Sequence, residues 1–92
     1  MIYFQAMEKY ELTIVLDTKA TAAKKKKVTE TIEKIVTLLK GKLGKAEDWG
    51  VKEAGLYLFF PLETPKFSVK MISTKVSQEE DIKKYLLIRK EK

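Results

Sequence analysis

The sequence predicts an α+β fold in which two helices cover one face of a four-stranded antiparallel sheet. Apolar and polar side chains alternate with a period of two over residues 10–16, which is typical of a half-buried strand. Apolar residues then recur at helical spacing over residues 28–39. Two strand-like runs, a short helical run and a last strand follow at residues 43–51, 56–62, 69–76 and 82–89. The resulting β-α-β-β-α-β order is that of a ferredoxin-like plait.

The first strand and the first helix carry sequence signals on their faces and at their ends. The strand places its apolar side chains on one face: Tyr10, Leu12, Ile14 and Leu16. Thr18 or Thr21 is expected to cap the helix, because a hydroxyl accepts a hydrogen bond from an unpaired first-turn N–H. Gly41 is expected to end it, since glycine readily adopts the left-handed conformation that closes many helices.

Glycine and proline residues mark the boundaries of the second half. Gly44 indicates a bulge or irregular start of the second strand, and Lys52–Gly55 is a turn short enough to close a hairpin. Pro61 has no N–H to donate, so it must face a gap in the sheet or lie near a strand end. Thr64 and Pro65 are expected to be the cap and the first position of the second helix.

The 92 residues fit a single domain, which we expect to span residues 7–92. Residues 1–6 are interpreted as an N-terminal addition. Tyr3-Phe4-Gln5-Ala6 is similar to the remnant of a protease-cleavage tag. The alternation of Ile2, Phe4 and Ala6 is also that of a short strand, which would extend the sheet.

The composition narrows the classes of function. The chain has no cysteine and no histidine, which excludes thiolate chemistry and removes the usual general base and the commonest metal ligand. No cofactor or metal is therefore expected. No apolar run approaches the roughly 20 residues of a membrane helix, so no membrane partner is expected.

The charge favours a polyanionic partner. The net charge is +6, and basic proteins gain affinity for nucleic acids by releasing condensed counterions. Arg89 is the only arginine. Because lysine lacks the bidentate fork of arginine, contact with phosphates is favoured over reading of bases.

The densest charge cluster is Lys24-Lys25-Lys26-Lys27. Four consecutive helical residues point around the whole circumference, so they cannot form one flat patch. The favoured interpretation is a solvated first turn. The alternative is phosphate contact, with Lys24 and Lys25 as the candidate residues.

Tyr57, Phe59 and Phe60 also have two interpretations. Aromatic side chains on a sheet stack bases in RNA-recognition motifs. The preceding Ala54-Gly55-Leu56 supplies only fragments of that signature. Packing in the core and on the sheet is the favoured interpretation.

No catalytic constellation is recognisable, so the chain is not expected to be an enzyme. Glu47 and Asp48 are neighbours in a strand and point to opposite faces, which favours a charged edge over an acid–base pair. The serines lack a histidine and a Gly-x-Ser-x-Gly elbow. No phosphate-binding glycine loop is present.

Three segments carry a resemblance to a known family. They are Lys9-Tyr10-Glu11, Glu47-Asp48-Trp49-Gly50 and Lys84-Tyr85-Leu86-Leu87-Ile88-Arg89. Together they resemble ribosomal protein six of the bacterial small subunit, over most of the chain. The resemblance implies a ferredoxin-like fold and a cytoplasmic location on the ribosome.

The resemblance also implies partners and contact residues. The protein would bind the central domain of small-subunit rRNA beside ribosomal protein eighteen. Lys9, Lys84 and Arg89 are the basic residues that it carries over for RNA contact. Trp49 and its strand, including Val51, would lie toward the protein partner.

The chain departs from this family after Trp49-Gly50. The family continues with Leu-Ala-Tyr-x-Ile and a lysine-rich hairpin tip, whereas here Glu53 leads directly to Ala54-Gly55. With the added residues 1–6, this shortening suggests an alternative: an engineered or divergent scaffold of the same fold, without native RNA binding. A shortened edge strand of such a scaffold could pair between two chains and form a homodimer.

Overall fold

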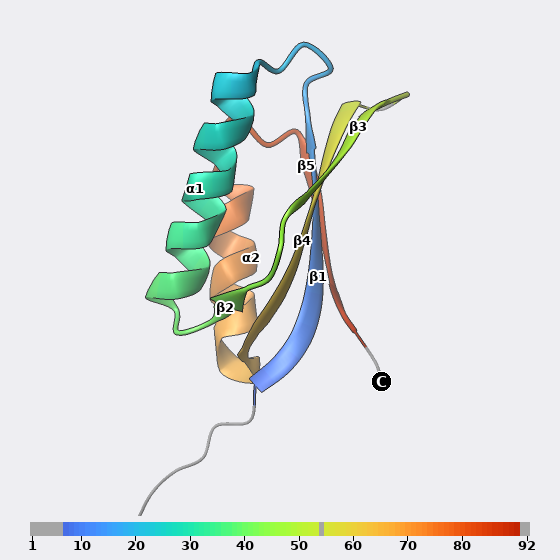
Figure 1. Cartoon of the computed structure of the whole chain (residues 1–92). Helices are drawn as coiled ribbons and strands as arrows, with labels where there is room; N and C mark the ends of the chain where they lie inside the picture. Colours follow the sequence, from blue (N-terminus) through green and yellow to red (C-terminus); the bar gives the residue numbers. More distant parts are fainter. Residues whose placement is uncertain (1–6, 54, 91–92) are drawn as a thin grey trace, which may run out of the picture.

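The computed structural model describes residues 7–53 and 55–90. Its elements are β1 (Met7–Leu16), α1 (Ala22–Leu38), β2 (Lys42–Leu43), β3 (Glu47–Lys52), β4 (Gly55–Pro65), the 3-10 turn η1 (Lys66–Ser68), α2 (Val69–Ser77) and β5 (Lys84–Arg89). Both helices lie on one face of the sheet (Figure 1). The interpretations of residues 1–6 as a tag remnant or extra strand lie outside the described residues, as do Ala54 and the last two residues.

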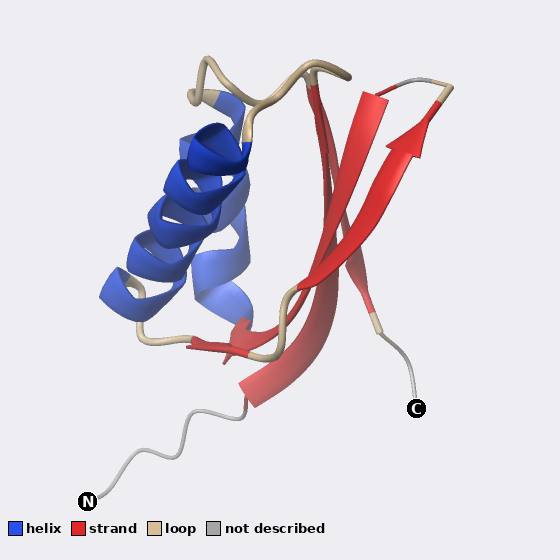
Figure 2. Cartoon of the chain, turned by 45° about the horizontal axis from the view of Figure 1, so that its top comes forward, coloured by secondary structure: helices blue, strands red, loops and turns tan. Residues whose placement is uncertain are grey.

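The sheet has the predicted antiparallel topology. Its order is β2-β4-β1-β5, and β3 also pairs with β4. Since β1 occupies one side of β4, β2 and β3 share the other side and together form the predicted second strand, interrupted at residues 44–46. Figure 2 shows this interruption as a loop between the two strands. The ferredoxin-like prediction is confirmed.

The core lies between the helices and the face of the sheet that they cover. Every second residue of β1 and β4 points into it because side chains alternate along a strand. The buried residues are Tyr10, Leu12, Ile14 and Leu16 of β1, Leu56, Leu58, Phe60 and Leu62 of β4, Val28, Ile32, Ile35 and Val36 of α1, and Ile72 and Val76 of α2. No described helix covers the opposite face, which we call the open face (Figures 1 and 2).

Pro61 faces a gap, as predicted. Its carbonyl accepts a hydrogen bond from the Gly44 N–H at 2.7 Å, on the side where β2 and β3 are interrupted. The N and C=O groups of one strand residue point to the same side, so the proline nitrogen, which cannot donate, also faces the interruption. Glycine fits closely here, because a Cβ at position 44 would lie 3.0 Å from the Pro61 ring, which would have to shift slightly.

The first helix begins and ends close to the predicted residues. Thr21 is the N-cap, and its hydroxyl accepts from the Lys24 N–H at 3.1 Å. At the other end Lys40, and not Gly41, adopts the left-handed conformation, with φ of 65°. The Gly41 N–H donates to the Val36 carbonyl at 2.8 Å, which completes a Schellman motif. The left-handed residue of this motif is therefore one position before the predicted glycine.

The prediction that Thr64 and Pro65 start the second helix is wrong. Both residues extend β4, where they pair with Glu8 and Met7 of β1. The Thr64 side chain is fully buried, and its Oγ1 has no hydrogen-bond partner among the described residues, so it caps no helix. Pro65 can end the strand because its missing N–H costs no ladder bond there.

Candidate nucleic-acid interface

The Trp-Gly dipeptide forms a bulge in β3. Asp48 and Gly50 pair with adjacent residues of β4, so Trp49 is the extra residue. Gly50 has a φ of 79°, in the left-handed region that glycine adopts without steric cost. A Cβ at this position would meet no atom within 4 Å, so backbone conformation alone selects glycine.

Asp48 ties this bulge to the first turns of α1. Its carboxylate accepts hydrogen bonds from the Gly50 N–H at 2.8 Å and from the Lys25 ammonium at 2.9 Å. The Lys25 hydrogen bond, and next to it the Gly50 bond, hold the pKa of Asp48 below its usual 3.8 because both favour the ionised form. Glu47 and Asp48 diverge, as predicted for neighbours in a strand.

The Trp49 ring lies on the open face and is held on two sides. It stacks on Phe59, with ring centroids 4.8 Å apart and planes inclined by 10°. Its Nε1 donates a hydrogen bond to the Glu47 carboxylate at 3.0 Å. The side chain nevertheless remains 45% exposed. The indole is therefore a fixed aromatic surface that still faces solvent.

The three aromatic residues of β4 divide between the two faces. Phe60 is fully buried in the core, which confirms the packing interpretation for this residue. Tyr57 and Phe59 are half-buried on the open face and are not members of the core. Phe59 packs on the sheet against Trp49. Core packing explains neither Tyr57 nor Phe59.

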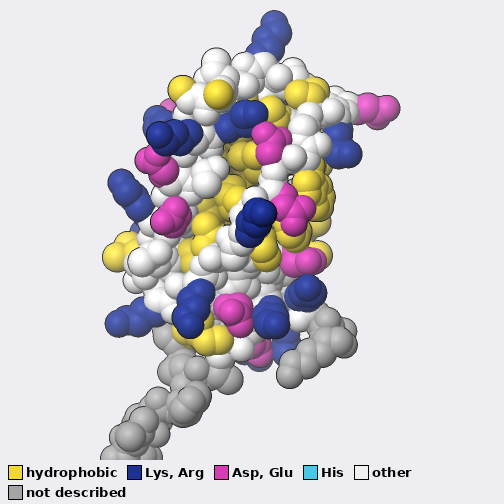
Figure 3. All heavy atoms as spheres, in the orientation of Figure 1, with side chains coloured by type: hydrophobic (Ala, Val, Ile, Leu, Met, Phe, Trp, Pro, Cys, Tyr) yellow, Lys and Arg dark blue, Asp and Glu magenta, His cyan; other side chains and the backbone are white. Residues whose placement is uncertain are grey.

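The predicted RNA-binding residues do not come together in one patch. Three of them are engaged by carboxylates: Lys24 with Asp81 at 3.4 Å, Lys25 with Asp48 at 2.9 Å and Arg89 with Glu8 at 3.2 Å. On the surface that Figure 3 shows, basic side chains are interspersed with acidic ones. Such exposed pairs are worth only about 0–1 kcal/mol each, so they can be exchanged for phosphate contacts at low cost.

Lys9 and Lys84 lie on the open face, toward its two ends. Lys84 pairs with Val15 of β1, whose odd-numbered residues face away from the helices. Lys9 lies six residues before Val15 on the same strand, which separates the two levels by roughly 20 Å. Each is exposed, and neither forms an ion pair with a described acidic residue.

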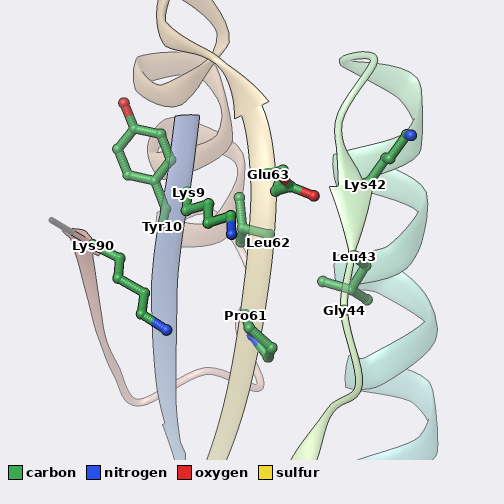
Figure 4. A pocket seen from close by; sticks show the side chains of 9 residues that line it. All are labelled: Lys9, Tyr10, Lys42, Leu43, Gly44, Pro61, Leu62, Glu63 and Lys90. Atoms are coloured by element: carbon green, nitrogen blue, oxygen red, sulfur yellow. The ribbon is translucent and has the colours of Figure 1, made fainter. Parts of the chain in front are cut away.

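Two further lysines join Lys9 in what we call the lysine row. Lys42 and Lys9 flank Glu63 across three strands, and the Lys90 N–H donates to the Lys9 carbonyl at 2.8 Å. Their side chains line an open groove of about 390 Å³ (Figure 4). Sequence reasoning missed Lys42 and Lys90, because only the pairing of four strands brings them beside Lys9.

The two predicted partner-binding residues lie on opposite sides of β3. Trp49 is on the open face, whereas Val51 pairs with the core residue Leu56 and is 60% exposed near the hairpin end. What the two residues have in common is that both border the outer edge of β3. Among the described strands β3 pairs with β4 alone, so this edge has no strand partner there.

We also searched the described residues for metal sites and membrane-spanning helices. Among them there is no group of three or more acidic side chains placed to hold a metal ion. None of the described helices is both long and apolar enough to cross a membrane. The positions that stand out are therefore surface aromatic and lysine residues on the sheet.

The fold and surface define a small α/β-plait protein with an aromatic, lysine-flanked open face. Residues 9–89 match the family model described as Ribosomal protein S6, and the chain belongs to the ribosomal protein S6 family. The match includes all three segments that carried the resemblance, which is thereby confirmed. Membership makes the protein a structural constituent of the cytoplasmic ribosome that associates with rRNA.

The fold is shared with solved structures, among them two from Thermotoga maritima. The 30S ribosomal protein S6 of Thermotoga maritima is 16% identical and superposes with a TM-score of 0.83, over 92% of this chain and 89% of that chain. The P2 domain of chemotaxis kinase CheA from Thermotoga maritima, solved in complex with the response regulator CheY, is 11% identical with a TM-score of 0.68, over 92% and 100%. Comparison with curated proteins gives no match. At these identities the structures show the fold alone, and the fold hosts more than one function.

Proposed function

We propose that the protein is a non-catalytic component of the small ribosomal subunit that binds the central domain of its rRNA together with ribosomal protein eighteen. The observation that carries the proposal is the family match over residues 9–89, which includes the Trp-Gly bulge and the basic residues at both ends of the sheet. Net charge of +6 supports binding to RNA phosphates.

Among the candidate RNA contacts, Lys9 and Lys84 are the strongest. Both side chains are exposed, and neither forms an ion pair with a described carboxylate. Binding a phosphate therefore does not require either lysine to leave a described acidic partner. Lys24, Lys25 and Arg89 are proposed as secondary contacts, because each must first leave a carboxylate.

We assign the protein partner to the outer edge of β3. An unpaired strand edge presents N–H and C=O groups that a partner segment can bind. Val51 supplies exposed apolar surface beside this edge. Trp49 borders the same edge from the open face, and it would contact a partner only where that partner wraps around β3.

The free edges also support a second candidate function, a self-associating scaffold without native RNA binding. β3 and β5 each pair on one side only among the described strands. Antiparallel pairing of either edge with a second copy would give a homodimer. Sedimentation tests this directly, since a monomer at all concentrations contradicts it.

Titration against central-domain rRNA over a range of salt concentrations, with and without ribosomal protein eighteen, tests the proposal. Lys9→Gln and Lys84→Gln should each weaken binding and reduce the salt slope by about 1. Lys34→Gln, on the outer face of α1, is the matched control and should change neither. Binding no tighter than to random RNA of equal length would overturn the proposal.

A further inference from the structure

We propose that the open face of the sheet binds unpaired RNA bases, which stack on Trp49 while the lysines at its two ends hold the flanking phosphates. This inference rests on the proposed RNA-binding function and names the kind of RNA that this surface takes. It assigns to Trp49 a role in RNA contact in place of the protein contact that the sequence suggested.

The first observation is a group of apolar and aromatic side chains on the open face, of which Trp49, Leu86 and Ile88 are exposed and Tyr57 and Phe59 are half-buried. Trp49 stacks on Phe59, and Phe59 lies level with Thr13 and Leu86 in the strand register. Ile88 is the next residue of β5 on the same face, and it is exposed like Leu86. We call Trp49, Phe59, Tyr57, Leu86 and Ile88 the open-face strip.

The second observation is that the indole is preorganised. One ring face packs on Phe59, and Nε1 is already bonded to Glu47, so the ring has no unmet donor. The bulge fixes the backbone on either side of it. Because the ring is held in place before binding, little side-chain entropy is lost when a base stacks on its exposed face.

The third observation is the distribution of charge around the strip. The lysine row at one end contains three lysines and one carboxylate, Glu63, which pairs in strand register with Lys9 and Lys42, and Lys84 lies at the other end. The roughly 20 Å between these levels suits the two or three bases that stack on sheets of this kind. An apolar centre between cationic ends is complementary to stacked bases between phosphates, which favours RNA over an apolar protein segment.

Two carboxylates on the open face shape the choice of base. Glu47 and Glu11 lie beside the strip and repel phosphates, which directs the backbone toward its lysine ends. A carboxylate accepts hydrogen bonds from exocyclic amino groups such as N4 of cytosine. Bases with such groups should therefore bind in preference to uracil.

Trp49 is the only tryptophan, so its fluorescence reports on this surface alone. A single-stranded adenine- and cytosine-containing oligonucleotide should quench the emission, and a fully paired duplex of equal length should not. Trp49→Ala should weaken binding of dye-labelled single-stranded RNA about 5- to 150-fold, the range for losing one aromatic stack. Trp49→Phe should retain most of the affinity, and Met71→Ala, an exposed apolar residue on α2, is the matched control.

The outcomes separate this inference from the proposed function. If central-domain rRNA binds but single strands neither quench Trp49 nor lose affinity in Trp49→Ala, the base-stacking surface is wrong and the proposed function stands. If Trp49→Ala weakens binding of ribosomal protein eighteen and leaves RNA binding unchanged, the open face is a protein-docking surface. If no RNA binds, both fail. Thermal unfolding of each variant confirms that a loss of binding is not a loss of fold.

Discussion

The Trp49 indole stacks on the Phe59 ring across the β3–β4 pairing, with centroids 4.8 Å apart and planes within 10° of parallel. The stack exists because the bulge places Trp49 on the open face, above a residue of the neighbouring strand. It therefore joins the Trp49-Gly50 bulge to the surface on which we expect RNA to bind. It also links the stability of the hairpin to that surface.

A double-mutant cycle should measure this stack. Phe59→Leu and Trp49→Leu each remove it while leaving an apolar side chain. The coupling free energy from urea unfolding of both single variants and the double variant should be about 0.5–1.5 kcal/mol, the usual worth of an aromatic pair beyond its buried area. Losses that add within 0.3–0.5 kcal/mol, as is usual for independent sites, would show that the stack adds nothing.

The ion pair of Asp48 should give the protein a specific acid sensitivity. Its folded-state pKa lies below 3.8, so its contribution to stability is present above the unfolded pKa and is lost as the pH falls through the folded pKa. Asp48→Asn keeps an acceptor for the Gly50 N–H but removes the charge. The variant should lose up to about 1 kcal/mol at pH 7, as is usual for an exposed pair.

The difference between wild type and Asp48→Asn should shrink as the pH falls below 3.8, measured by urea unfolding. Glu33→Gln, which removes one negative charge from an exposed position on α1, is the matched control. A difference that stays constant from pH 7 down to pH 2 would mean that the Asp48 charge does not stabilise the fold.

Replacing Lys40 with glycine should stabilise the protein. Lys40 closes α1 in the left-handed conformation, where a Cβ is unfavourable and glycine is the usual residue. Lys40→Gly should raise the free energy of unfolding by about 0.5–1 kcal/mol, after allowing for the greater entropy of glycine in the unfolded chain. Lys40→Ala removes the same charge but keeps the Cβ, so it should change stability little. Equal effects of the two variants would contradict the conformational explanation.

The lysine row should contribute more to RNA affinity than the lysine cluster of the first helix. Lys42→Gln with Lys90→Gln should reduce the salt slope for RNA binding by about 2, or about 1 for each lost phosphate contact. Lys24→Gln with Lys25→Gln should reduce it less, because both side chains already bind carboxylates. Filter binding at several salt concentrations measures both, and the opposite order would place the main RNA contact at the start of α1.

Local signals predicted the elements well where local physics decides them. The period of two in β1 and the helical spacing in α1 correctly identified the residues that enter the core. The proline rule placed Pro61 beside a gap. Thr64 and Pro65 were misassigned because the length of β4 depends on the partner strand, which begins at Met7 and lies far away in the sequence.

The candidate site was predictable only in part. The sequence indicated Lys9, Lys84 and the Trp-Gly dipeptide, and the structure places all of them on or beside the open face. The sequence did not indicate that Lys24, Lys25 and Arg89 form ion pairs with acidic side chains of other segments. It also did not indicate Lys42 and Lys90, since lysines on separate strands carry no shared local pattern.

By itself the sequence determined the order of elements, the core-facing residues and the family, because periodicity and short motifs are properties of neighbouring residues. Only the tertiary structure decided what each surface residue faces. The strand register places Phe59 under the Trp49 ring, and the packing of α1 beside β3 brings the Lys25 ammonium to the Asp48 carboxylate. Contacts between elements depend on the pairing of distant segments, and that pairing also turns scattered lysines and aromatics into one surface.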